Sequence, residues 1–125
     1  MSQDRTIEQF LYDMRDAADL VNKFVAETDE ATFTSAPGGS WAIERGVIQL
    51  GEIATQMRKR HSEYMDEHPE LDPAGMRALR NIVVHGYATI KLDRIWSLAV
   101  DKVPALGDAA DAALRELTRN SGLER

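Results

Sequence analysis

Residues 7–25 read IEQFLYDMRDAADLVNKFV, and their apolar side chains return every three or four positions. This spacing gathers the apolar side chains on one side of an α-helix, and acidic side chains occupy the other side. The pattern predicts a long amphipathic helix from Asp4 to about Glu27.

Apolar residues keep helical spacing through most of the remaining chain. Residues 28–40 are rich in threonine, serine and glycine and include Pro37, so we expect a connector there. Residues 68–70 (HPE) interrupt the pattern again, and Asp72 followed by Pro73 is typical of a helix start. Further helices are predicted from Ser40 or Trp41 to about Glu63, from Pro73 to near Gly86, from about Leu92, and from Pro104 toward the tail.

The fold class that follows is all-α, because no alternating strand pattern competes with the helical spacing. We expect an antiparallel bundle of four to five helices in a single domain that spans residues 1–125. Residues 1–3 and about 119–125 are expected to be disordered ends.

Composition excludes several kinds of protein. The chain has no cysteine, which excludes disulfides, thiolate metal sites and cysteine nucleophiles, and a cytoplasmic location is the default expectation. No stretch approaches the roughly 18 apolar residues that a membrane-spanning helix needs, and the first ten residues do not resemble a signal peptide. A net charge of −6 argues against binding nucleic acid through bulk positive charge, so any such contact must be local.

One segment is basic. Residues 73–102 hold five lysines and arginines against two acids, whereas the rest of the chain is acidic. On a helix, Arg80 and Tyr87 lie seven positions apart and project in nearly the same direction, while Asn81 and His85 lie four apart on an adjacent line. Polar side chains of four kinds therefore converge on this segment.

These residue types suit phosphoryl transfer without a metal. Arginine offers a fork of donors to phosphate oxygens, and histidine moves a proton at neutral pH. If His85 takes the proton from a ribose 2′-hydroxyl and Arg80 stabilises the charge on the phosphate, RNA is cut and a 2′,3′-cyclic phosphate remains. Spacing alone leaves a plainer alternative, in which Arg80 pairs with a carboxylate of a neighbouring helix and His85 caps the helix end.

Several runs, in order, resemble a known family. The chain from about residue 41 to residue 106 is similar to the HepT-like branch of the HEPN superfamily. The runs that carry the resemblance are residues 41–54 (WAIERGVIQLGEIA), 68–71 (HPEL), 79–87 (LRNIVVHGY), 92–96 (LDRIW) and 103–106 (VPAL).

The resemblance implies a small helical homodimer that acts as a metal-independent ribonuclease toxin. Arg80 and His85 match the family's catalytic pair, Asn81 matches the polar residue that follows the arginine, and Arg77 is a candidate RNA contact. Tyr87 matches a tyrosine to which a small nucleotidyltransferase antitoxin attaches AMP in such families. No cofactor or metal is implied, and the expected partners are RNA, the antitoxin and a second copy of the chain. The alternative is a non-catalytic HEPN module that binds a nucleotide or a nucleotidyltransferase.

Other candidates have plainer interpretations beside functional ones. The run Arg58-Lys59-Arg60-His61 is a solvated helix end or an RNA backbone contact. His61 and His68 lie among acidic residues but lack the spacing of metal ligands, so no metal site is predicted. Glu52 orients Arg80 or the dimer, or faces solvent. Trp41 and Trp96 are expected to be core or interface anchors.

Overall fold

The structure is a computed structural model, and it describes residues 5–35, 41–72 and 91–120. All elements in these ranges are helical, and none is a strand, so the predicted all-α class is confirmed for them. The elements are α1 (Ile7–Ala26), α2 (Glu30–Ser35), α3 (Trp41–Arg60), α4 (Ser62–Glu67), the 3-10 turn η1 (Pro69–Leu71), α6 (Leu92–Asp101) and α7 (Val103–Asn120).

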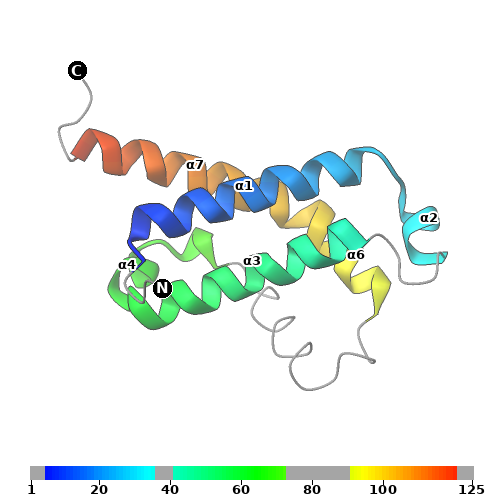
Figure 1. Cartoon of the computed structure of the whole chain (residues 1–125), viewed down its shortest axis with the longest axis horizontal. Helices are drawn as coiled ribbons and strands as arrows, with labels where there is room; N and C mark the ends of the chain where they lie inside the picture. Colours follow the sequence, from blue (N-terminus) through cyan, green and yellow to red (C-terminus); the bar gives the residue numbers. More distant parts are fainter. Residues whose placement is uncertain (1–4, 36–40, 73–90, 121–125) are drawn as a thin grey trace.

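Among the described residues, the long helices are α1, α3 and α7, which lie along one another (Figure 1). α1 packs along both α3 and α7, and it runs antiparallel to each of them. Gly107 near the start of α7 meets Ala18, while Asp111, one turn later, pairs with Arg15, one turn earlier in α1. The expected antiparallel arrangement of helices is therefore present.

The predicted apolar stripe of α1 is its buried face. Met14 and Leu11 are fully buried, and they join residues of α3, α6 and α7 in one apolar core. Thr6 caps the helix, because its hydroxyl accepts a hydrogen bond from the Gln9 backbone N–H while the Gln9 side chain accepts one from the Thr6 N–H. This capping box starts the helix at Ile7, three residues after the predicted start.

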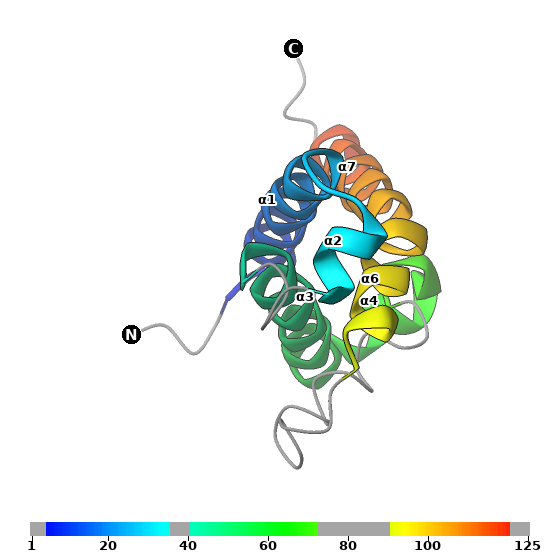
Figure 2. The same ribbon diagram turned by 90° about the vertical axis from the view of Figure 1, so that its right-hand side faces the viewer.

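The expected connector at residues 28–40 is wrong for its first half, because the structure has helix α2 there. Asp29 accepts a hydrogen bond from the Thr32 backbone N–H at 2.8 Å, as a helix N-cap does. Phe33 is 1% exposed and its ring lies 5.4 Å from that of Trp96 on α6. Figure 2 looks at this end of the bundle and shows α2 lying across it, between the long helices. A single buried aromatic side chain thus holds the short helix in place.

Other boundaries differ by a few residues. The helix predicted to run to Glu63 ends at Arg60, and a separate helix α4 begins at Ser62. The predicted break at residues 68–70 is confirmed, since α4 ends at Glu67 and η1 follows. Helix α7 continues through Arg119 to Asn120, beyond the point where a disordered tail was expected.

Candidate functional site

The residues predicted to carry chemistry lie in the segment 73–90, outside the described residues. They are Arg77, Arg80, Asn81, His85 and Tyr87. The structure instead describes the elements on either side of this segment along the chain, which are η1 before it and α6 after it. The contacts of η1 show how the chain is held just before this segment.

The chain enters this segment from a fixed point. Leu71 is fully buried, and the Asp72 side chain is 4% exposed. Oδ2 of Asp72 lies 3.9 Å from Nη2 of Arg58, and Nη1 of Arg58 also pairs with Asp66 at 2.5 Å. Asp72 is thereby held against the C-terminal turn of α3.

The basic run at the end of α3 therefore has internal partners. Arg58 forms the two ion pairs just described, and Arg60 donates a hydrogen bond to the side chain of Gln56. His61 Nε2 donates to the backbone carbonyl of Arg5 at 2.8 Å, and its ring packs edge-on against Phe10. These contacts favour the interpretation of the run as a helix end, since Arg58 and His61 are occupied with holding neighbouring elements.

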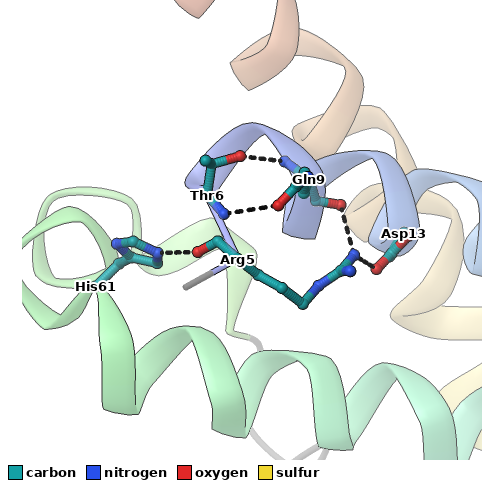
Figure 3. Close-up of polar contacts among 5 residues, drawn as sticks. All are labelled: Arg5, Thr6, Gln9, Asp13 and His61. Carbon is teal, nitrogen blue, oxygen red and sulfur yellow. Dashed lines mark hydrogen bonds and ion pairs between the residues drawn. The ribbon is translucent and has the colours of Figure 1, made fainter. Parts of the chain in front are cut away.

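Figure 3 shows that His61 belongs to a larger junction with the start of α1. Arg5, whose carbonyl accepts from His61, forms an ion pair with Asp13 through its side chain. Thr6, the next residue, carries the capping box. One short segment thus links the beginning of α1 to the turn between α3 and α4.

The two histidines considered as metal ligands have different partners. His68 Nδ1 donates to the backbone carbonyl of Tyr64 at 2.9 Å, and the His68 ring stacks on that of Tyr64 with centroids 4.0 Å apart. Its Nε2 lies 3.7 Å from Oε1 of Glu116 on α7. Within residues 5–35, 41–72 and 91–120, no group of three or more His, Asp or Glu side chains is placed to hold a metal.

Two glutamates of α3 lie in partly buried positions. Glu52 accepts a hydrogen bond from the side chain of Gln56 at 2.9 Å, so it is neither a plain solvent-facing residue nor a deeply buried one. Glu44 is unusual, because its Oε2 is buried and has no hydrogen-bond partner in the described part of the chain. Burial raises the pKa of the Glu44 carboxyl above its usual value of 4.5. Sequence reasoning missed Glu44, since a glutamate on a long amphipathic helix gives no sign of burial.

The two tryptophans, each expected to be a core or an interface anchor, differ in burial. Trp96 is half-buried and packs against the core next to Phe33, as expected of an anchor. Trp41 is 79% exposed, so the expectation of a core position is wrong for it, and an interface remains the other expectation.

A second group of polar side chains, absent from the sequence interpretation, lies between α1 and α7. Tyr12, Arg15, Asp111, Leu114, Arg115, Thr118 and Arg119 line a groove of about 340 Å³. No spacing pattern could have indicated it, because its two sides lie at opposite ends of the sequence.

Within the described residues, no helix has the length and apolar character that crossing a membrane requires.

Comparison with known proteins assigns the chain to a class. The model of the family described as "Ribonuclease HepT-like" matches residues 14–113, a region that contains every predicted site residue. The chain belongs to the HepT-like ribonuclease family. This confirms the resemblance to HEPN proteins and extends it into α1, and it makes the chain a ribonuclease of the HEPN type.

Individual relatives are distant but match over most of their length. "Putative RNase MJ1380" of Methanocaldococcus jannaschii is 26% identical over 102 residues, which cover 82% of this chain and 91% of that protein. "Probable ribonuclease HepT" of Thermococcus cleftensis is 22% identical over 102 residues, with 82% and 90% covered. No solved structure matches the chain.

Proposed function

We propose that this protein is the ribonuclease toxin of a HEPN and nucleotidyltransferase pair, and that it cleaves RNA with Arg80 and His85 without a metal. The observation that carries the proposal is the series Arg80, His85 and Tyr87, which falls inside the region matched by a ribonuclease family. A module that served only as a scaffold has no physical need for these three residue types on one short segment.

The proposed reaction uses the nucleophile that RNA contains. His85 removes the proton from a ribose 2′-hydroxyl, and O2′ then bonds to the adjacent phosphorus. The bond from phosphorus to O5′ breaks, and the leaving oxygen receives a proton. The products are a 2′,3′-cyclic phosphate and a 5′-hydroxyl end. Arg80 stabilises the negative charge that builds on the phosphate oxygens in the transition state.

The nearby polar residues have supporting roles in this proposal. Asn81 adds a hydrogen bond beside Arg80, and Arg77 contacts the RNA backbone one helical turn earlier. Arginine suits both positions because its guanidinium presents several donors in a fixed plane to phosphate oxygens.

We also propose that the working unit is a homodimer in which two copies of the basic segment face one cleft. Residues 73–102 carry a net charge of +3, although the whole chain carries −6. Two such segments side by side concentrate positive potential where a phosphate chain must enter. Two copies of His85 in one cleft could then divide the base and acid roles between them.

Tyr87 is the proposed point of control. It follows His85 by two positions, so an AMP attached to its hydroxyl would place an anionic phosphate near Arg80 and a bulky nucleoside in the cleft. A small nucleotidyltransferase antitoxin would form this bond between the tyrosine oxygen and the α-phosphorus of ATP, with release of pyrophosphate.

Single substitutions test the catalytic part. His85→Ala and Arg80→Ala should each abolish cleavage of RNA by the purified protein, while circular dichroism shows an unchanged helical content. Arg94→Ala, which removes a charge from the same basic segment, should keep most of the activity. Cleavage near the wild-type rate by either of the first two variants would show that other residues carry the reaction. No cleavage by the wild-type protein would favour the alternative, a non-catalytic module that binds a nucleotide or a nucleotidyltransferase.

Intact mass tests the control by Tyr87. The protein is produced together with the nucleotidyltransferase encoded beside it, and wild type is compared with Tyr87→Phe. The proposal expects a mass increase in multiples of AMP for wild type and none for the variant. An increase that persists in Tyr87→Phe would place the modification elsewhere, and no increase in either protein would leave inhibition by simple binding.

A further inference from the structure

We propose that the groove between α1 and α7 binds single-stranded RNA, as an accessory contact outside the segment that carries Arg80 and His85. This inference rests on the proposed function, because it takes RNA as the substrate. Figures 1 and 2 both show α1 and α7 lying side by side along the body of the fold. The groove is lined by side chains from the first half of α1 and from Asp111 to Arg119 of α7.

Charge is the first argument. Three arginines line the groove, and the only acid in its lining is Asp111. Asp111 is shared between two of the arginines, at 3.6 Å from Arg15 and 2.7 Å from Arg115. Arg119 forms no ion pair with another residue in the described part of the chain. Arg15 also pairs with Asp16, the next residue, at 3.4 Å. Three arginines therefore face two paired acids, and in a chain of net charge −6 the groove keeps an excess of one positive charge, with Arg119, unpaired among the described residues, as its fork of donors for phosphate oxygens.

The aromatic side chain is the second argument. Tyr12 is 43% exposed, and the Arg15 guanidinium lies over its ring, 5.0 Å from the centroid. Nucleic-acid bases stack on tyrosine rings and on arginine planes, so this cation–π pair offers both kinds of partner to a base. Proteins that bind single strands combine these two features, a basic track for the backbone and an aromatic platform for bases.

The volume of the groove and its apolar lining are the third argument. The groove has a volume of about 340 Å³, which is within the range of small-molecule sites and suits one nucleotide. Its lining also includes the apolar side chain of Leu114, which is 5% exposed. An acidic peptide would pair with the arginines but would make no use of the exposed Tyr12 ring. The observations therefore favour RNA over an acidic protein partner.

The test measures binding of a fluorescent 2′-O-methyl RNA strand of about 12 nucleotides, a length within the range that one binding surface covers. The strand has no free 2′-hydroxyl, so it reports binding without being cleaved. The variant Arg115→Gln/Arg119→Gln should bind it at least about 10-fold more weakly than wild type. Its affinity should also depend less steeply on salt, with a log–log slope reduced by about 1.4 for two lost phosphate contacts.

Matched variants isolate the groove from overall charge. Lys23→Gln/Arg45→Gln removes two exposed cations outside the groove, and it should bind the strand as wild type does. Tyr12→Ala should weaken binding about 5-fold or more, whereas Tyr12→Phe keeps the ring and should stay close to wild type. Equal weakening by the control pair would mean that overall charge, rather than the groove, governs binding, and the proposal would be wrong.

Cleavage of the corresponding ribose strand separates this inference from the proposed function. If wild type cleaves RNA and the groove variants bind and cleave it unchanged, the groove proposal fails and the ribonuclease proposal stands. If wild type neither binds nor cleaves RNA, both proposals fail.

If the groove variants bind RNA normally but no longer bind the nucleotidyltransferase partner, the groove is a protein interface and the proposal is overturned. A raised KM with unchanged kcat for the groove variants is the supporting result.

Discussion

Val21 of α1 fills the space that a side chain on Gly46 of α3 would occupy. A β-carbon at position 46 would overlap Cγ2 of Val21, and Val21 is 1% exposed. Valine has one strongly preferred rotamer in a helix, so its methyl group cannot turn away at low cost. The absence of a side chain at Gly46 is therefore what lets α1 and α3 approach this closely.

Gly46→Ala should lower the free energy of unfolding by about 1–2 kcal/mol. Overpacking a core costs about 1–3 kcal/mol, and the better helix propensity of alanine returns up to about 1 kcal/mol. Urea unfolding followed by circular dichroism measures the change. Val21→Ala added to Gly46→Ala should cost less than the two single changes together, by about 0.5–3 kcal/mol, because the clash is gone. Additive costs would show that the two residues do not interact.

Phe33→Ala should destabilise the protein by about 3–5 kcal/mol, the usual cost of removing a buried phenylalanine. The cost arises because the ring is 1% exposed and packs against Trp96. Leu20→Ala is the comparison, since Leu20 is 53% exposed on α1 and its loss should change stability by about 0.5 kcal/mol or less. Thermal unfolding of both variants decides the matter, and similar midpoints would show that α2 is not held by Phe33.

Glu44→Gln should flatten the dependence of stability on pH. Burial raises the pKa of Glu44 in the folded protein, so the folded state holds its proton more tightly than the unfolded chain does. Stability then falls as pH rises from about 4.5 through the raised pKa of the folded state, because ionising Glu44 becomes a cost. The free energy of unfolding of wild type, relative to that of Glu44→Gln, should therefore be highest at acid pH and should decrease toward neutral pH.

The measurement for Glu44 is urea unfolding at several pH values between about 4 and 7. Glu67→Gln removes an exposed glutamate of α4 and is the control. A difference between wild type and Glu44→Gln that stays constant across this range would show that the carboxyl titrates alike in both states.

RNA cleavage should continue in EDTA and should stop when the scissile ribose is replaced by deoxyribose. The proposed reaction takes its proton transfer from His85 and its charge stabilisation from Arg80, and its nucleophile is the 2′-hydroxyl. Mass spectrometry of the products should find 2′,3′-cyclic phosphate ends. A strict need for magnesium, or cleavage of DNA, would contradict this reaction.

Light scattering should give a mass near twice the 14.0 kDa of one chain. The proposed cleft needs two copies of the basic segment, and two-fold dimers are the commonest soluble oligomers. Trp41→Ala should shift the mass toward that of one chain, because a tryptophan that is 79% exposed in one chain is suited to be an interface anchor. A monomer mass across micromolar concentrations would exclude the shared cleft.

The long helices could be predicted from the sequence because each buries a stripe that repeats over many turns. Met14 and Leu11 belong to such a stripe, and both are fully buried. Helix α2 could not be predicted in this way, since six residues contain too few turns for a period to show. The end of α3 at Arg60 could not be predicted either, because residues 61–68 (HSEYMDEH) contain no glycine or proline that would mark a helix end.

Part of the candidate site could likewise be predicted from the sequence, and part of it could not. The series of Arg80, His85 and Tyr87 is local, so a family resemblance finds it without a structure, and its chemistry stays a prediction. Tyr12 and Arg115 are brought together only by the packing of α1 on α7. Likewise the burial of Glu44 depends on its neighbours in space, which helical spacing does not encode.

Helix α2 also sets how the end of the bundle exchanges with solvent. Six residues are too few to persist as a helix in water, so α2 exists only while Phe33 remains in the core. Its amide hydrogens should therefore exchange with deuterium at rates close to those of α6, on which it rests, and not at the rates of a fraying surface turn. Although insertions between long helices are usually harmless, an insertion within residues 30–35 should therefore destabilise the core as well as this short helix.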